Sequence, residues 1–194
     1  MKIRLLTRED KIAWLRLART ERVGPVAFES LLSMFGTPES ALKHLSEMAA
    51  NGGGKKITPC SIEDAEQEFF YGEEKGAVLL PKCDPLYPDS LRQIKDSPNV
   101  IWAFGKVSLL QNRCFGVVGS RNASLNGRNF TRKISAKINE AGYTIVSGMA
   151  IGIDRAAHEG SLDAPNGTIA VLGCGVDVVY PYENHDLYGE ILEN

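Results

Sequence analysis

The sequence predicts an α/β fold in which a doubly wound, mainly parallel sheet follows a small all-helical domain. Three observations lead to this prediction. Apolar residues in the first fifty positions recur at helical spacing, whereas after residue 76 short apolar runs alternate with amphipathic segments. Three of those apolar runs end in glycine or small polar residues, as strands do where a parallel sheet forms a ligand crevice.

The N-terminal domain, expected at residues 1–75, consists of helices. Ile12, Leu15 and Ala18 recur at the spacing of one helix face. Pro25 stands where it can begin the next helix, because its missing N–H costs nothing at a first helical position.

The domain boundary is predicted near Gly76. Residues 51–56 contain three consecutive glycines and form the clearest loop of the sequence. Residues 61–75 return to a helical pattern, so this loop is expected inside the N-terminal domain. The α/β domain is then expected to span residues 76–194.

The α/β domain is predicted from its alternating elements. Strands are expected at residues 77–80, 100–104, 114–119, 143–147 and 168–172, and helices at 127–141, 153–162 and 184–192. Strands that alternate with helices indicate parallel βαβ units. The strand that begins at Cys114 is expected to be buried.

The helix at 127–141 is expected to be amphipathic. Its apolar residues recur three and four positions apart and are expected to face the sheet: Phe130, Ile134, Ile138 and Ala141. Its other face carries four cations, which form a possible basic flank of a binding site: Arg128, Arg132, Lys133 and Lys137.

The composition excludes several classes of protein. No apolar run approaches the roughly 18 residues that a membrane helix needs, and the N-terminus lacks the pattern of a secretory leader. A cytoplasmic protein with reduced thiols and no membrane partner is the expectation. The cysteines and histidines have no metal-ligand spacing, so no metal or cofactor is expected: Cys60, Cys83, Cys114, Cys174, His44, His158 and His185.

The net charge of −2 is unevenly distributed. Residues 106–160 hold eight Lys or Arg and three Asp or Glu, whereas residues 161–194 hold six Asp or Glu and no Lys or Arg. The basic block coincides with a glycine-rich segment. It marks either a site for a polyanion or a solvated face.

Three glycine-rich loops are expected to line one crevice, because carboxyl ends of parallel strands lie at one edge of a sheet. Glycine lets a backbone approach phosphate closely, and Arg121 offers a planar fork to it. The sequence therefore predicts an anion site, against the alternative that the glycines only form tight turns. Its predicted contacts are Gly119, Ser120 and Arg121, then Ser147, Gly148, Met149, Ala150 and Gly152, and finally Gly173 and Gly175.

The motifs do not specify an enzyme. The glycine spacing matches neither a dinucleotide fingerprint nor a P-loop. Asp154 and His158 lie four residues apart, so they form either an acid–base pair or a helix-capping carboxylate with a supporting histidine, and we favour the structural roles. Asn184 is expected to cap the last helix. No catalytic residue is assigned.

Several ordered motifs are similar to the DNA-processing protein A family, also called Smf. They include the glycine-serine-arginine loop, the later Tyr-Pro-x-x-Asn motif and, upstream, an Asp-Pro-x-Tyr-Pro segment. The quoted runs are 118–121, 146–158, 167–172, 180–187 and 84–98. Residues 23–25 and 35–36 resemble the N-terminal domain of that family, which is similar to a sterile-alpha-motif or helix-hairpin-helix module.

The resemblance implies an extended Rossmann-like domain that binds single-stranded DNA and has no established catalysis. It implies a role in natural transformation: protecting incoming DNA and helping to load the RecA recombinase. It also implies a homodimer in the full-length protein. The phosphates are expected at Gly119–Arg121 and Ser147–Gly148.

Two features depart from that pattern. Ile151 occupies a position where the family usually has an arginine, and Asn126 stands where an aromatic residue is common. The chain also ends before the later strands and the C-terminal winged-helix-like domain that the resemblance leads us to expect, so we interpret it as a fragment.

Two alternatives stay open. One is a nucleotide-processing Rossmann enzyme of the lysine-decarboxylase-like (phosphoribohydrolase) group, although the Pro-Gly-Gly-x-Gly-Thr-x-x-Glu signature of that group does not occur here. The other assigns the main role to the N-terminal helices, as a second DNA contact or as a protein-interaction module.

Overall fold

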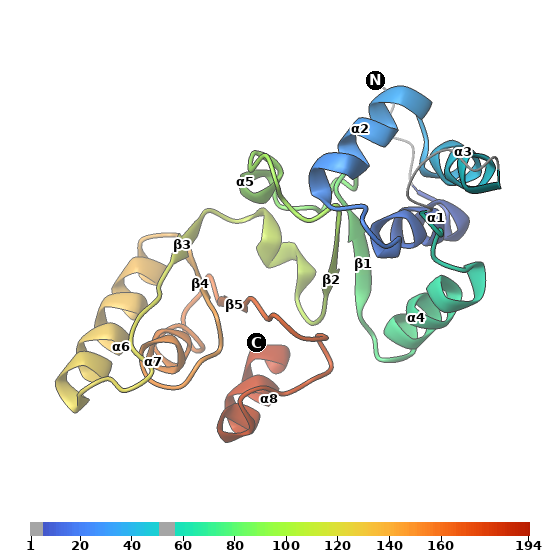
Figure 1. Cartoon of the computed structure of the whole chain (residues 1–194). Helices are drawn as coiled ribbons and strands as arrows, with labels where there is room; N and C mark the ends of the chain where they lie inside the picture. Colours follow the sequence, from blue (N-terminus) through green and yellow to red (C-terminus); the bar gives the residue numbers. More distant parts are fainter. Residues whose placement is uncertain (1–5, 51–56) are drawn as a thin grey trace. The chain divides into compact units, whose positions relative to one another are not determined.

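The computed structural model describes residues 6–50 and 57–194, so the loop expected at 51–56 lies outside the described residues. The chain forms two compact units, Met1–Ala103 and Phe104–Asn194. Figure 1 shows the elements of each. The predicted α/β fold, with a parallel sheet that follows a helical domain, is confirmed.

The first unit contains helices and one pair of strands. Their bounds are α1 Arg8–Arg19, α2 Pro25–Phe35, α3 Pro38–Ala50, α4 Ile62–Glu74, β1 Val78–Pro81, α5 Asp89–Arg92 and β2 Val100–Ala103. A reciprocal capping box begins α1: the Thr7 side chain accepts the Asp10 N–H, and the Asp10 carboxylate accepts the Thr7 N–H. Pro25 is the first residue of α2, as predicted.

Strands β1 and β2 belong to this unit. They pair antiparallel with each other. Leu79 and Val100 lie in the same apolar cluster as Trp14 and Phe28 of the helices. The boundary expected at Gly76 therefore lies inside the first compact unit. The alternation of apolar runs could not show this, because it does not say which strands pair.

The second unit contains the parallel sheet. Its elements are η1 Val107–Gln111, β3 Cys114–Gly116, α6 Leu125–Glu140, β4 Thr144–Ser147, α7 Ile153–Glu159, β5 Thr168–Ala170, η2 Tyr182–Asn184 and α8 His185–Glu193. The strand order is β3-β4-β5, and both pairs are parallel. Helices α6 and α7 pack against each other and against β4 (Figure 1).

The expected buried face of α6 is wrong. Phe130 is 68% exposed and Ile134 is 37% exposed, whereas Thr131, Ser135 and Asn139 are buried. The helix faces α7, where Gly160 lies so close that an added Cβ would overlap the Arg132 carbonyl. Small side chains permit this close approach, and a ridge of large apolar residues would prevent it.

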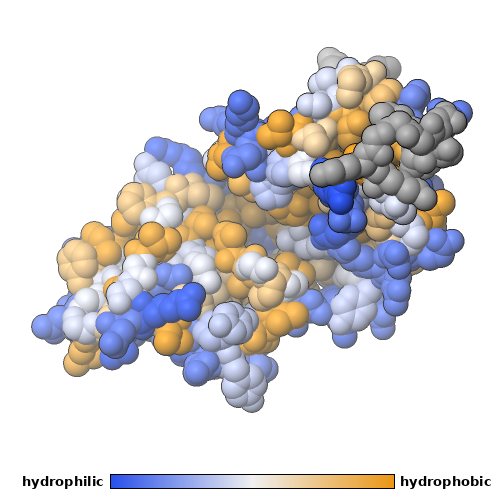
Figure 2. Space-filling view, in the orientation of Figure 1, coloured by the Kyte–Doolittle hydropathy of each residue, from blue (hydrophilic) through white to orange (hydrophobic). Residues whose placement is uncertain are grey.

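The expected burial of the strand at Cys114 is also wrong. All three residues of β3 are exposed, and Phe115 retains 45% of its accessible surface. The reason is that β3 is an edge strand in the described sheet, whereas β4 lies between two neighbours. The space-filling view shows apolar surface over this part of the unit (Figure 2).

Within the described ranges, no helix has the length and apolar character to cross a bilayer. The four cysteines are free thiols. No group of three or more His, Cys, Asp or Glu side chains in the described part of the chain is arranged to hold a metal ion.

Candidate functional site

The loops that follow β3 and β4 are in direct contact. Gly152 has a φ of +87°, and a Cβ there would overlap the Ser120 carbonyl and lie 2.5 Å from the Arg121 carbonyl oxygen. The Ile153 N–H donates to the Ser120 carbonyl at 3.1 Å. Because only glycine combines this backbone angle with this lack of volume, Gly152 positions the Gly119–Arg121 loop.

The Gly119–Arg121 loop presents unused hydrogen-bond donors. The backbone N–H groups of Gly119, Ser120 and Arg121 donate to no described residue. The Arg121 side chain is exposed and makes no ion pair with any residue at 6–50 or 57–194. The Ser120 hydroxyl oxygen accepts the Asn122 N–H at 3.1 Å, which leaves its hydrogen available. Successive free N–H groups beside a free guanidinium form a suitable site for phosphate.

The Ser147–Gly148 segment has a different role from the expected one. Ser147 is buried, and its hydroxyl donates to the Val117 carbonyl at 2.7 Å. The Gly148 N–H donates to Asp154 Oδ2 at 3.1 Å. These donors join the ends of β3, β4 and α7, so they support the loops instead of facing a ligand.

Met149 of the β4 loop faces inward, whereas Ile151 of the same loop is 40% exposed. Met149 is 1% exposed, has a φ of +61° and packs with Leu162 and Leu187. The Ala150 carbonyl accepts the Arg155 N–H. Strand β5 pairs with β4, so the loop after β5 lies next to the β4 loop. A Cβ added at Gly173 of the β5 loop would meet no atom within 4 Å. Gly175 of that loop lies beside Asp177.

Asp154 and His158 lie beneath this site. Asp154 is not the N-cap of α7, which is Gly152, and its carboxylate receives the Gly148 N–H instead. The His158 Nδ1 lies 2.7 Å from Thr168 Oγ1, whose own hydrogen is donated to the Ile145 carbonyl. Nδ1 must therefore carry the imidazole proton. Burial lowers the pKa of His158 to about 4, and its ring is inaccessible to a ligand.

Asn184 is the N-cap residue of α8, as expected, but its side chain makes no capping hydrogen bond. Its amide Nδ2 instead donates to the Met149 carbonyl at 2.6 Å, and its Oδ1 accepts from Arg155 at 2.9 Å. Asn184 thus stabilises Met149, the residue of the β4 loop with a positive φ, through a contact between segments that are far apart in sequence.

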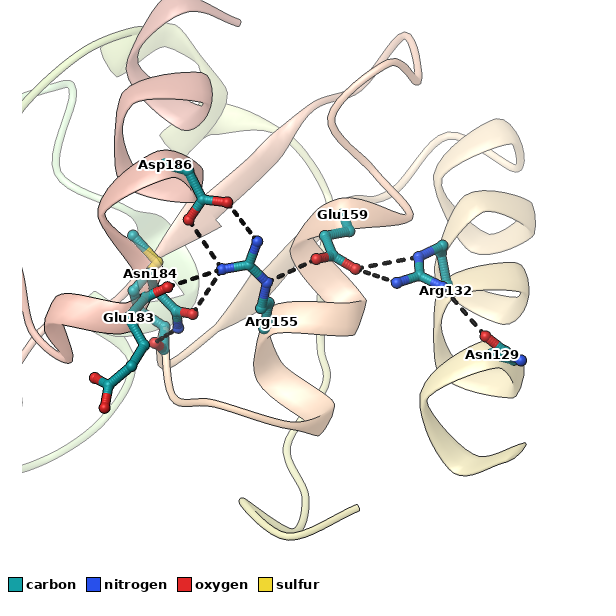
Figure 3. A network of polar contacts seen from close by, with 8 residues as sticks. Asn129, Arg132, Arg155, Glu159, Glu183, Asn184 and Asp186 are labelled. Atoms are coloured by element: carbon teal, nitrogen blue, oxygen red, sulfur yellow. Dashed lines mark hydrogen bonds and ion pairs between the residues drawn. The ribbon is translucent and has the colours of Figure 1, made fainter. Parts of the chain in front are cut away.

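A chain of ion pairs connects three helices (Figure 3). Arg155 of α7 donates to Glu159 at 2.7 Å and to Asp186 of α8 at 2.6 Å, and Glu159 also pairs with Arg132 of α6. Hydrogen bonding to Arg155 lowers the pKa of Asp186 far below its usual range. Burial alone would raise the pKa of Glu159, but its bonds to Arg132 and Arg155 lower it.

Sequence reasoning did not single out the members of this chain on α7 and α8. The spacing of Arg155 and Glu159 is a recognisable helical ion-pair signal. Nothing in the sequence identifies Asp186 as a partner, because the contact depends on tertiary packing.

The four cations of α6 do not form one basic face, contrary to expectation. Arg128 and Arg132 line a pocket beside Gly152 together with residues of α7. Lys133 and Lys137 are exposed and do not line it. One turn separates Arg128 from Arg132, so those two share a side of the helix that the two lysines do not.

Two family models match the chain. The model described as DNA recombination-mediator protein A matches residues 78–194, and a DprA-like N-terminal HHH domain matches residues 8–70. Gly76 lies between these two matches.

Curated proteins similar to this chain carry names of the same family. Protein Smf of Synechocystis sp. is 33% identical over 197 residues, which are 96% of this chain and 50% of the relative. DNA processing protein DprA of Bacillus subtilis is 37% identical over 175 residues, or 86% of this chain and 59% of the relative. The chain thus spans about half the length of these curated relatives.

Solved structures resemble it as well. DprA from Streptococcus pneumoniae has a TM-score of 0.68 at 28% identity, covering 96% of this chain and 65% of that one. DprA from Helicobacter pylori, whose structure describes a single-stranded DNA binding mode, has a TM-score of 0.53 at 27% identity, covering 60% of this chain and 51% of that one. On the evidence of sequence, fold and domain order, this chain belongs to the DNA recombination-mediator protein A family, that is, the DprA/Smf proteins.

Proposed function

We propose that this chain is a single-stranded DNA-binding module and that it holds the DNA backbone at the Gly119–Arg121 loop. The observation that carries the proposal is the exposed, unpaired Arg121 guanidinium on a loop whose backbone N–H groups have no partner among the described residues. A planar fork and adjacent N–H donors suit phosphate oxygens, and phosphate is the part of DNA that does not depend on sequence.

The chemistry of the relatives supports DNA as the polyanion. The Helicobacter pylori DprA described above binds single-stranded DNA, and this chain shares its fold over 60% of its length. The basic block at residues 106–160 surrounds the loop. Release of counterions from phosphates would contribute to affinity and make it depend on salt.

By its family membership, we infer a role in DNA processing during natural transformation. We infer that the protein protects incoming single strands, helps to load the RecA recombinase and acts as a homodimer in the cytoplasm. These functions are proposed from the family as a whole, and the chain spans about half the length of its curated relatives.

We propose no catalytic role for the site. The one acid–base pair that the sequence offered consists of His158, which is fully buried, and Asp154, which is occupied by the Gly148 N–H. General acid–base catalysis needs groups within reach of the substrate proton, and His158 cannot reach one from its position. Nucleoside monophosphates incubated with the protein should release no base.

The proposal is tested by salt-titrated binding to fluorescently labelled oligo-dT. We expect micromolar or tighter binding that weakens steeply between 50 and 200 mM salt. Arg121→Ala should lower affinity for all sequences alike and reduce the slope of log K against log[salt] by about 0.7, the value for one phosphate of a single strand.

Lys137→Ala is the matched control, because it removes one exposed cation from the same unit away from the loops. Its affinity should remain that of the wild type. Binding that does not respond to salt, or an Arg121→Ala variant that binds like the wild type, would contradict the proposal. Equal affinity for duplex DNA would contradict the preference for single strands.

A further inference from the structure

An open pocket of about 610 Å³ lies beside the Gly152 turn, between α6, α7 and the start of α8. This volume is within the range of about 300–1,000 Å³ that is usual for ligand pockets. Gly152 lines this pocket, and a Cβ added at Gly152 would overlap the Ser120 and Arg121 carbonyls. The pocket is therefore the immediate neighbour of the Arg121 loop.

The three arginines of the pocket differ in what they bind. Arg155 donates from all three of its guanidinium nitrogens, to Glu159, Asn184 and Asp186 among others. Arg132 is paired with Glu159. Arg128 is exposed and makes no ion pair with the residues that the structure describes. Arg128 is thus the cation that this pocket offers to a ligand.

The anionic side chains of the pocket do not neutralise Arg128. Figure 3 shows the Glu159 and Asp186 carboxylates directed at Arg132 and Arg155, and the Glu183 carboxylate pointing away from the Arg155 guanidinium. Ile151 lines the same pocket, is 40% exposed and brings no charge. The pocket therefore combines one available guanidinium with apolar surface.

We propose that Arg128 forms a second phosphate subsite for the same DNA strand that Arg121 holds, with the strand crossing the Gly152 turn between them. This inference rests on the proposed function. A guanidinium binds phosphate oxygens in a bidentate manner, and the exposed apolar surface of Ile151 suits a sugar or base. Lys133 and Lys137, which lie outside the pocket, take no part.

The first test compares Arg128→Ala with Lys137→Ala in the oligo-dT titration. Arg128→Ala should lower the affinity for oligo-dT and reduce the slope of log K against log[salt] by about 0.7. The ratio of wild-type to variant affinity should therefore fall by about 2.6-fold between 50 and 200 mM salt. Lys137→Ala removes the same charge from the same helix and should retain the wild-type slope.

The second test adds a charge instead of removing one. Ile151→Arg places a cation in the same pocket, so it should raise affinity in the wild type and restore the lost salt slope in the Arg128→Ala background. A gain of binding cannot result from misfolding. Circular dichroism of each variant would verify that the fold is retained.

The outcomes separate this inference from the proposed function. If Arg121→Ala weakens binding while Arg128→Ala equals Lys137→Ala, the subsite is refuted and the proposed function stands. If Ile151→Arg fails to restore the slope of Arg128→Ala, the pocket does not receive a phosphate and the inference is also refuted. If Arg121→Ala and Arg128→Ala both bind like the wild type, both proposals fail.

Discussion

His158 should make the second unit sensitive to mild acid. Its imidazole is fully buried, donates through Nδ1 to Thr168 and has no partner at Nε2 in the described structure. Burial lowers its pKa from 6.5 to about 4, against a weaker opposing effect of Asp154. Because the unfolded chain binds the proton first as the pH falls, stability is complete above pH 6.5 and is lost progressively toward pH 4.

The magnitude follows from the difference between the two pKa values. A shift from 6.5 to about 4 corresponds to about 3.4 kcal/mol when the loss is complete, since one unit is worth about 1.36 kcal/mol. Between pH 8 and pH 5 the same two values give a loss of about 2 kcal/mol. His158→Asn keeps a donor for Thr168 Oγ1 but cannot titrate, so it should lack this part of the acid dependence.

The assay has to report on the second unit alone. Both tryptophans, Trp14 and Trp102, belong to the first unit, so their fluorescence does not follow α7. Hydrogen-exchange mass spectrometry of peptides from β4 to β5, in urea at pH 8, 7, 6 and 5, measures the free energy of unfolding where His158 lies. An identical loss of stability with falling pH in the wild type and in His158→Asn would refute the reasoning.

Two further substitutions test how the site is supported. Gly152→Ala should weaken oligo-dT binding and lower the free energy of unfolding by about 1–3 kcal/mol more than Gly142→Ala does; Gly142 shares the positive φ (+94°) but has no atom within 4 Å of an added Cβ. Equal effects of the two glycine variants would show that crowding against the Ser120 and Arg121 carbonyls is unimportant. Asn184→Ala should cost about 1–3 kcal/mol because the Met149 carbonyl loses its donor. Asn184→Asp keeps the oxygen that accepts from Arg155 but loses the amide donor to Met149, so it should be destabilised as well. A free energy of unfolding in urea equal to that of the wild type in both variants would contradict the role of Asn184.

Local patterns were sufficient to predict the strands of the parallel sheet and the loop that carries Arg121. Pro25 predicted the start of α2, and the alternation of apolar runs predicted the parallel strands β3, β4 and β5. Parallel strands place their carboxyl ends at one edge of the sheet, so the sequence alone predicts that the loops after β3 and β4 lie next to each other. The predicted role of Arg121 in DNA binding is still to be tested.

Local patterns were insufficient wherever burial depends on which surfaces meet. Phe130 and Ile134 have the spacing of a core face, yet α6 buries Thr131, Ser135 and Asn139, because Gly160 at the end of α7 permits the two helices to approach closely. Ser147 has the chemistry of a phosphate donor, yet its hydroxyl is used by the Val117 carbonyl of the neighbouring strand. The type of a residue does not determine which hydrogen-bond partner the tertiary structure places beside its side chain.

The sequence by itself thus determined the fold class, the order of the elements and the loop that carries Arg121. These features follow from periodicity and from the backbone requirements of glycine and proline, which act over a few residues. The tertiary structure decided which donors remain free, because Ser147, Gly148, Asn184 and Arg155 are occupied by partners that lie on other elements of the fold. It also decided that Arg128 shares a pocket with Gly152 while Lys137 does not, since that depends on how α6 packs against α7.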